Sequence, residues 1–130
     1  MSKSRGNLLS LFAPEKQLKQ EVMNIMTDSK ALEEPKDPDT CKVFALYRLV
    51  GSPEGTETMR KNYLAGGYGY GHAKKELLAV LLDVFKYERS EYDRLMNDLP
   101  TLDEQLKIGA EIATVVARGV LDRVRGKLGY

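Results

Sequence analysis

The chain has 130 residues, of which 42% are hydrophobic and 30% are charged, a composition typical of one globular domain. Twenty basic residues against nineteen acidic ones give a net charge of +1, so a nucleic-acid surface would need local clustering of basic side chains. A single cysteine, Cys41, excludes an internal disulfide and a thiolate metal cluster. No apolar run approaches the roughly 20 residues of a membrane span, and no signal-peptide core follows the N-terminus. A cytoplasmic protein without membrane segments is therefore expected.

Helical spacing of apolar residues starts near Pro14 and predicts a first helix. The residues that carry this spacing are Leu18, Val22, Ile25 and Met26. Residues 1–12 are expected to be an exposed leader, and residues 27–38 a charged loop. Asp37 then has the character of an N-cap for a second helix, although periodicity alone also allows a buried strand over residues 41–50.

Proline and glycine mark the next predicted boundaries. Ser52 and Pro53 begin a third helix that is expected to end at Gly66 and Gly67. A long amphipathic segment follows over residues 72–97. Thr101 and Glu104 then match a capping box at the start of the last helix.

The last helix has apolar residues on two sides. One side is formed by Leu106, Ala110, Ala113, Ala117, Val120, Val124 and Leu128, and the other by Ile108, Ile112, Val115 and Val116. Gly109 and Gly119 each cost about 1 kcal/mol inside a helix, which suggests close packing there. Because no strand alternation or internal repeat is evident, the chain is predicted to be all-α, a bundle of about five helices.

The stretch "YLAGGYGYGHAKK", residues 63–75, holds four glycines and raises the question of a phosphate-binding loop. Gly66 and Gly71 have P-loop separation, but His72 replaces the required lysine and Ala73 the required hydroxyl residue. A dinucleotide fingerprint fails as well, because no strand precedes the loop. The glycines are therefore predicted to form a joint between two helices, with Tyr68 and Tyr70 pointing in opposite directions.

Other chemistry is sparse in this sequence. His72 is the only histidine, and nothing in the sequence places it beside Cys41 with a third orienting group. Cys41 is expected to be a small core residue and His72 a first-turn or surface residue. The carboxylates show no metal-binding pattern.

Basic residues cluster in two places. Lys74 and Lys75 follow the two tyrosines, and Arg118 and Arg125, seven residues apart, lie on one face of the last helix. Two interpretations remain open: solvated, salt-paired helix faces, or contacts to the phosphates of single-stranded RNA beside stacking aromatic rings.

A family resemblance rests on longer stretches. "MSKS" is similar to the last four residues of the KMSKS signature of class I aminoacyl-tRNA synthetases. "LFAPEKQLKQEVMNIMTDSKALEEPKDPDTCKVFALYRLV" and "MRKNYLAGGYGYGHAKKEL" closely resemble the stretch that follows this signature in bacterial tryptophanyl-tRNA synthetases. The similarity covers essentially the whole chain and is loosest beyond Phe85.

The resemblance implies a ligase that joins tryptophan to ATP with Mg²⁺, releases pyrophosphate and charges tRNA(Trp). Such enzymes are homodimers in which a Rossmann catalytic domain precedes a helical domain that receives the anticodon arm. Residues 1–12 would then be a remnant of the KMSKS loop, and residues 13–130 the C-terminal, anticodon-binding-like domain. In this helical domain, the resemblance makes Lys74, Lys75, Arg118 and Arg125 candidate tRNA contacts.

Carried over by position, Lys3 would be the second signature lysine, which meets the ATP triphosphate. Met1, Ser2 and Ser4 would complete the ATP-binding segment. The first lysine of the signature is missing, and nothing resembles the HIGH motif or a Rossmann sheet. The chain is therefore expected to be a C-terminal fragment that is inactive alone. The alternative is a structural helical domain that docks or oligomerises without binding tRNA, which the two apolar sides of the last helix favour.

Overall fold

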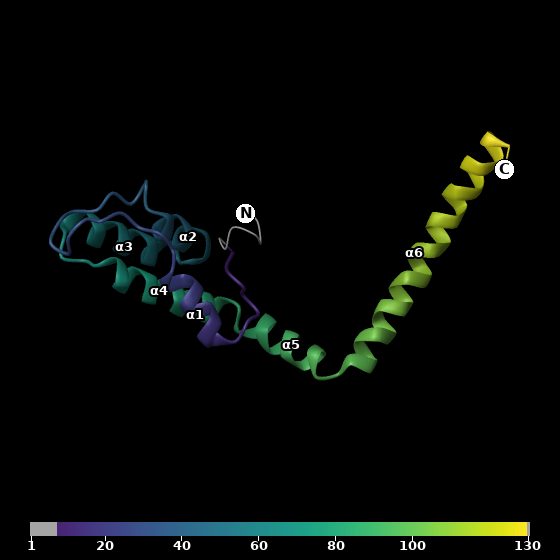
Figure 1. Cartoon of the computed structure of the whole chain (residues 1–130), viewed down its shortest axis with the longest axis horizontal. Helices are drawn as coiled ribbons and strands as arrows, with labels where there is room; N and C mark the ends of the chain where they lie inside the picture. Colours follow the sequence, from purple (N-terminus) through teal and green to yellow (C-terminus); the bar gives the residue numbers. More distant parts are fainter. Residues whose placement is uncertain (1–7, 130) are drawn as a thin grey trace. The chain divides into compact units, whose positions relative to one another are not determined.

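The computed structural model describes residues 8–129, and the regular elements in this range are helices (Figure 1). They are α1 (Glu15–Met23), α2 (Lys42–Val50), α3 (Pro53–Ala65), α4 (Tyr70–Val84), α5 (Lys86–Met96) and α6 (Leu99–Leu128). The predicted all-α class is confirmed, with six helices in the described range instead of about five. No helix between residues 8 and 129 has the length and apolar character that a membrane crossing requires.

The chain divides into two compact units, with the division between Arg89 and Ser90. The first unit contains α1 to α4 and the start of α5, and the second contains the rest of α5 and α6. The boundary predicted from the sequence lies elsewhere, between residues 12 and 13, where the signature-like segment would meet the helical domain. That boundary stays a prediction.

The core of the first unit forms where α4 packs against α1 and α2, and α2 against α3. Its most buried apolar side chains are Leu18, Val22, Val43, Phe44, Met59, Tyr63, Ala73 and Leu77. Full burial of one large apolar side chain stabilises a fold by about 1.5–3 kcal/mol. The core therefore holds together helices that are individually too short to be stable in water.

The end of the first helix and the start of the second differ from expectation. Helix α1 ends at Met23, so Ile25 and Met26 lie beyond it. Helix α2 confirms the helical interpretation of residues 42–50, but its N-cap is Cys41 and not Asp37. The prediction failed because the Asp37 carboxylate is used inside a separate turn, where it accepts hydrogen bonds from Asp39 and Thr40.

Helix α3 begins and ends as predicted. The hydroxyl of Ser52 accepts a hydrogen bond from the Gly55 amide at 3.0 Å, and Pro53 occupies the first turn. Gly66 and Gly67 end the helix with φ values of 79° and 74°, a left-handed conformation that favours glycine.

The long segment expected over residues 72–97 is instead two helices. Phe85, with φ −98° and ψ 16°, separates α4 from α5 and packs against the core of the first unit. Helix α4 also begins at Tyr70, two residues before the expected start.

Helix α6 begins earlier than the predicted capping box. Asp98 is its N-cap and accepts a hydrogen bond from the Thr101 amide at 3.3 Å, while Pro100 lies inside the first turn. A proline at this place costs nothing because its missing N–H has no partner in the first turn anyway. The prediction that a capping box at Thr101 begins the last helix was therefore wrong.

Helix α6 also lacks the close packing expected at its glycines. Side chains beyond Leu102 are exposed as far as the described part of the helix extends. A β-carbon added at Gly109 or Gly119 would meet no other atom within 4 Å. The two apolar sides predicted from the sequence are thus both present and uncovered in the described residues.

Gly66→Ala tests the corner after α3. An added β-carbon would lie 2.4 Å from the carbonyl oxygen of Glu33 on a backbone with φ +79°. We expect the free energy of unfolding to fall by more than about 2 kcal/mol, because the clash adds to the strain of the left-handed conformation. Urea unfolding measures this difference.

The matched control is Gly67→Ala, where φ is +74° and an added β-carbon would meet nothing within 4 Å. Backbone strain alone predicts a loss of about 1 kcal/mol for this variant. If both variants lost the same free energy of unfolding, the close contact with the Glu33 carbonyl would have no destabilising effect of its own.

Candidate functional site

The residues between α3 and α4, 66–69, form what we call the glycine joint, and residues 24–41 form a docked loop that packs on it. The Gly67 amide donates a hydrogen bond to the Leu32 carbonyl at 3.0 Å, and the Lys36 amide donates to the Tyr63 carbonyl at 2.7 Å. The prediction of a structural joint is thereby confirmed. Its glycines bring the loop backbone close to α3, and the joint is not a nucleotide pocket built on a strand.

Lys36 holds the docked loop from inside. Its side chain is only 2% exposed, and its Nζ donates hydrogen bonds of 2.9, 3.1 and 3.0 Å to the carbonyls of Ala31, Leu32 and Glu34. The same ammonium lies 5.4 Å from the centre of the Tyr70 ring. Burying a charged group is costly without partners, and here all three ammonium protons have a carbonyl. Lys36 is thus a structural cation that the sequence analysis missed, since its loop reads as ordinary charged surface.

Three tyrosines meet at the joint. The ring of Tyr63 lies 5.6 Å from that of Tyr68 and 6.0 Å from that of Tyr70, measured between centroids. Tyr68 and Tyr70 thus both pack on Tyr63, and the prediction that they point in opposite directions stays a prediction.

Hydrogen bonding connects the tyrosines to the loop. The Tyr70 hydroxyl donates to the Asp28 carboxylate at 2.6 Å, which holds the pKa of Asp28 below its usual range. Burial is the main cause that raises the pKa of Tyr63 and Tyr70 well above the ordinary value for a tyrosine. Both phenols therefore stay protonated at neutral pH, and the Tyr70 hydroxyl acts as a donor.

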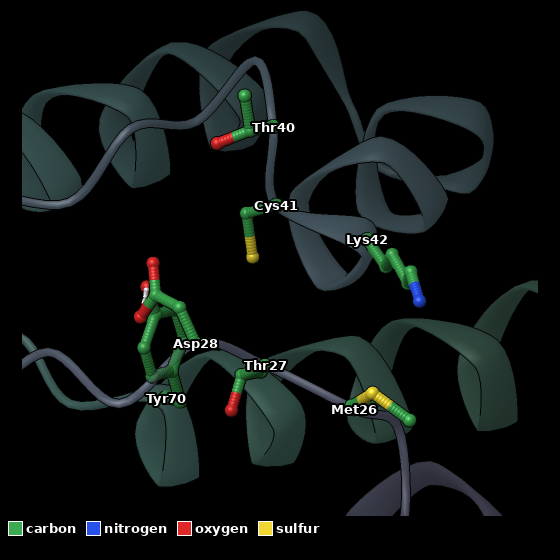
Figure 2. Close-up of a pocket in the computed structure, with 7 residues that line it drawn as sticks. All are labelled: Met26, Thr27, Asp28, Thr40, Cys41, Lys42 and Tyr70. Carbon is green, nitrogen blue, oxygen red and sulfur yellow. Dashed lines mark hydrogen bonds between the residues drawn. The ribbon is translucent and has the colours of Figure 1, made fainter.

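A cavity of about 290 Å³ opens between the docked loop and the starts of α2 and α4 (Figure 2). It is lined by Met26, Thr27, Asp28, Thr40, Cys41, Lys42 and Tyr70. The volume lies at the lower limit of ligand pockets, which begin near about 300 Å³. Within the described residues, no group of three or more His, Cys, Asp or Glu side chains is placed to hold a metal ion.

Cys41 and His72 lie where the sequence predicts. Cys41 is buried, and its Sγ points into the cavity, 3.4 Å from the Tyr63 hydroxyl (Figure 2). His72 is exposed in the first turn of α4, with its ring 6.1 Å from that of Tyr68.

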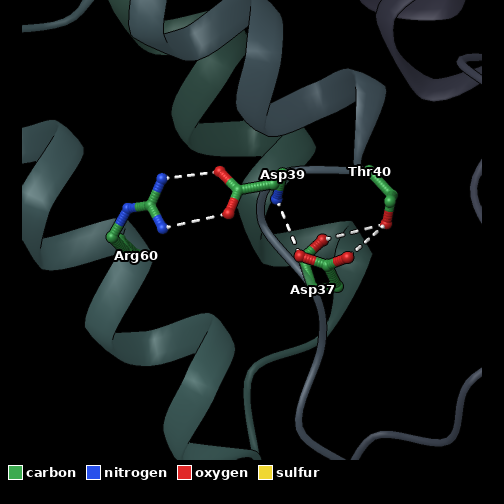
Figure 3. Close-up of polar contacts among 4 residues, drawn as sticks. All are labelled: Asp37, Asp39, Thr40 and Arg60. Atoms are coloured by element: carbon green, nitrogen blue, oxygen red, sulfur yellow. Dashed lines mark hydrogen bonds and ion pairs between the residues drawn. The ribbon is translucent and has the colours of Figure 1, made fainter.

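The turn before α2 carries a polar network (Figure 3). Asp37 accepts hydrogen bonds from the Asp39 amide at 2.9 Å and from the Thr40 hydroxyl at 3.0 Å. Asp39 pairs with Arg60 of α3 at 2.7 Å, and this guanidinium holds the pKa of Asp39 below its usual range. Because Arg60 also lies 5.2 Å from the centre of the Phe44 ring, the network fastens the turn to both α2 and α3.

The segment before α1 is held by a second set of polar contacts. The Glu21 carboxylate accepts hydrogen bonds from the Ser10 amide at 2.6 Å and the Ser10 hydroxyl at 3.0 Å. The Arg89 guanidinium donates to the carbonyls of Leu11 and Ala13, the latter at 2.9 Å. We call residues 10–13 the anchor segment. No motif in the sequence indicates these contacts, because their partners are distant along the chain.

The Glu21 pKa lies below its ordinary value, first because of the Ser10 amide and then because of the Gln17 side chain. A carboxyl with a lowered folded-state pKa stabilises the fold above its unfolded-state pKa. That stabilisation is lost as the pH falls through the folded-state value. The contact between Glu21 and Ser10 is thus intact at neutral pH.

The predicted tRNA contacts lie in two different units. Lys74 is half-buried, and its Nζ donates to the Met23 carbonyl at 2.9 Å, which ties α4 to the end of α1. Lys75 is exposed on α4, and Arg118 and Arg125 are exposed on α6. Their role in binding stays a prediction. Met1, Ser2, Lys3 and Ser4 lie outside the described residues.

Comparison with known proteins bears on the family. A scan against protein-family models finds no match. The chain is 42% identical over 129 residues to the tryptophan–tRNA ligase of Rhodopirellula baltica, covering 99% of this chain and 40% of that protein. It is 36% identical to the tryptophan–tRNA ligase of Campylobacter jejuni strain RM1221, with the same two coverages.

Solved structures agree with these relatives. The crystal structure of tryptophanyl-tRNA synthetase from Campylobacter jejuni superimposes with a TM-score of 0.89 at 36% identity, over 100% of this chain and 42% of that one. A second structure of that protein, complexed with ADP and tryptophan, gives the same TM-score and covers 41% of that chain. The resemblance to the C-terminal part of tryptophanyl-tRNA synthetases is confirmed.

The chain spans about 40% of the length of the tryptophanyl-tRNA synthetases that it matches. Both the identity and the superposition extend past Phe85, where the resemblance read from the sequence was loosest. The helical architecture described above is therefore that of the matched part of these synthetases.

Lys36→Met tests the structural cation. Methionine has similar length but leaves the three loop carbonyls without their donor. We expect a loss of about 2–3 kcal/mol in the free energy of unfolding, together with faster amide hydrogen exchange in residues 24–41. Denaturant unfolding and exchange mass spectrometry measure the two effects.

Lys30→Met is the control, because this lysine is exposed in the same loop and donates to one carbonyl, that of Pro35, at 3.2 Å. Its effect is expected to stay within about 0.5 kcal/mol. An Lys36→Met variant as stable as the unsubstituted chain would contradict the assigned role.

Proposed function

We propose that this chain acts as the helical, tRNA-docking part of a tryptophan–tRNA ligase. The full-length ligase would join tryptophan to ATP, release pyrophosphate and transfer the activated tryptophan to tRNA(Trp). The supporting observation is the 42% identity over 129 residues to a tryptophan–tRNA ligase, which extends over 99% of this chain. The enzyme would be a cytoplasmic homodimer, with its Rossmann catalytic domain in sequence outside these 130 residues.

The chemistry assigned to this chain is limited to its first residues. Lys3, flanked by Met1, Ser2 and Ser4, would place an ammonium against the ATP phosphates as charge develops on the leaving pyrophosphate. In this proposal, Mg²⁺ and the remaining contacts to ATP and tryptophan belong to the catalytic domain. The chain alone is proposed to be inactive in tryptophan activation.

The tRNA-docking role would use exposed cations. Lys75, Arg118 and Arg125 are exposed, so their charges can reach phosphates without breaking buried contacts. Lys74 already donates to the Met23 carbonyl, but an ammonium has three donors and two remain for a phosphate. The tyrosines of the joint are a weaker choice for base stacking, because Tyr68 and Tyr70 pack on Tyr63.

Filter binding of this chain to tRNA(Trp) tests the docking role. Phosphate contacts predict that the logarithm of the association constant falls linearly with the logarithm of salt concentration. Reversing the charge with Lys75→Glu or Arg118→Glu should weaken binding roughly tenfold at about 0.1 M salt.

Lys16→Glu, on the exposed face of α1, is the matched control and should bind nearly as well as the unsubstituted chain. Absence of binding, or equal loss in all three variants, would count against these residues as the docking surface. The same preparation should catalyse no tryptophan-dependent exchange of pyrophosphate into ATP.

A second function, structural docking without tRNA binding, is favoured by the surface of α6. Ten large apolar residues of this helix are exposed: Leu99, Leu106, Ile108, Ile112, Val115, Val116, Val120, Leu121, Val124 and Leu128. A helix of 30 residues is about 45 Å long, so this apolar surface is extended. Large exposed apolar patches mark interaction sites in soluble proteins.

Sedimentation velocity tests the docking function on this chain. We expect the sedimentation coefficient to rise with protein concentration, because apolar α6 surfaces of two copies can cover each other. Replacing Ile112 and Val116 together by glutamate should shift the chain toward the monomer. Glu111→Gln, at an exposed polar position of the same helix, should change little. A clean monomer that binds no apolar dye would contradict this function.

A further inference from the structure

We propose that Glu21 and Arg89 are positioning residues for the ATP-dependent step, because they fix the anchor segment from which the signature-like residues 1–4 extend. The inference rests on the proposed function, since it needs Lys3 to act on ATP in the full-length ligase. Neither residue is proposed to touch ATP. Both act through the backbone of residues 10–13.

Glu21 fixes the beginning of the anchor segment. Its two carboxylate oxygens accept separately from the amide and the hydroxyl of Ser10, at 2.6 and 3.0 Å. Gln17, one turn earlier on α1, donates to the same carboxylate at 2.9 Å and helps to orient it. Hydrogen bonds to a charged acceptor are stronger than those between neutral groups. Ser10 is thereby tied to α1 by side chain and backbone together.

Arg89 fixes the end of the anchor segment. One nitrogen of its guanidinium donates to the Leu11 carbonyl and the other to the Ala13 carbonyl. Because the guanidinium is planar and rigid, two backbone points are held by one side chain. These contacts connect positions 78 and 76 residues apart in the chain. They join the anchor segment to the start of α5, as the Glu21 contacts join it to α1.

Apolar burial supports the anchor segment only in part. Leu9 and Leu11 are half-buried against the core of the first unit, whereas Phe12 is 44% exposed. The polar contacts of Glu21 and Arg89 therefore fix the position of the anchor segment more closely than the apolar contacts alone do. An ammonium in place of the guanidinium lacks the planar fork and would hold the two carbonyls less rigidly.

The anchor segment lies close to residues 1–4 along the chain. Seven peptide units separate Lys3 from Ser10, which limits the distance between their α-carbons to roughly 25 Å. The rate depends on where a group that stabilises a transition state is held. A fixed point at residues 10–13 restricts the positions that Lys3 can reach, so loss of Arg89 should affect the use of ATP.

The test is tryptophan-dependent exchange of pyrophosphate into ATP by the full-length ligase, with ATP and tryptophan varied separately. Arg89→Gln should raise the KM for ATP or lower kcat about tenfold, and leave the KM for tryptophan within twofold. Arg89→Lys should recover part of the loss. Lys86→Gln, at an exposed position of the same helix, is the matched control and should behave as the unsubstituted enzyme.

Hydrogen exchange on this chain provides a second readout that does not depend on activity. Amides of residues 10–13 should exchange faster in Arg89→Gln and in Glu21→Gln, while those of α2 and α4 keep their protection. Unchanged exchange in residues 10–13 would overturn the inference directly.

The kinetic outcomes separate the inference from the proposed function. An unsubstituted full-length protein without exchange activity would overturn both. An active enzyme whose Arg89→Gln variant keeps its kcat and its KM for ATP within twofold would overturn the inference alone. Equal changes in the KM for ATP and for tryptophan, together with a lower melting temperature, would show a merely structural role and also overturn it.

Discussion

The close approach of the docked loop to the glycine joint is the constraint on which the first unit depends. Gly66 lies so near the Glu33 carbonyl that a β-carbon has no room, and Lys36 is buried beneath the same loop with three carbonyl partners. A loop of 18 residues between two helices costs much conformational entropy when it is fixed. Backbone contacts at the joint, the buried ammonium and the tyrosine rings together offset that cost.

Polar clamps of this kind recur around the core. Arg60 fastens the turn before α2, Lys74 fastens the end of α1, and Arg89 fastens the anchor segment. In each case a cation from a helix meets a carbonyl or carboxylate of an irregular segment or of a helix end. Loops have little apolar surface to bury, so charged hydrogen bonds hold them where packing alone does not. One of the predicted tRNA contacts, Lys74, is thereby also engaged within the fold.

The second unit is organised differently. Its long helix carries exposed apolar side chains and exposed arginines along the same element, whereas the first unit buries its apolar residues in one core. The matched synthetases are about two and a half times as long as this chain, which covers 40% of their length. The exposed apolar side chains of α6 are therefore the feature that favours the proposed structural docking function.

Local signals in the sequence determined the helical class, the Ser52 cap, the glycine corner after α3 and the buried position of Cys41. The resemblance of two long stretches of sequence to tryptophanyl-tRNA synthetases indicated the family. Only the tertiary structure decided that Asp37 serves a turn, that Phe85 divides a helix and that Lys36 is buried. It also decided the Arg89 contacts, whose partners lie more than 70 residues away. The physical reason is that caps and corners depend on neighbours along the chain, whereas buried cations and clamps depend on segments that only folding brings together.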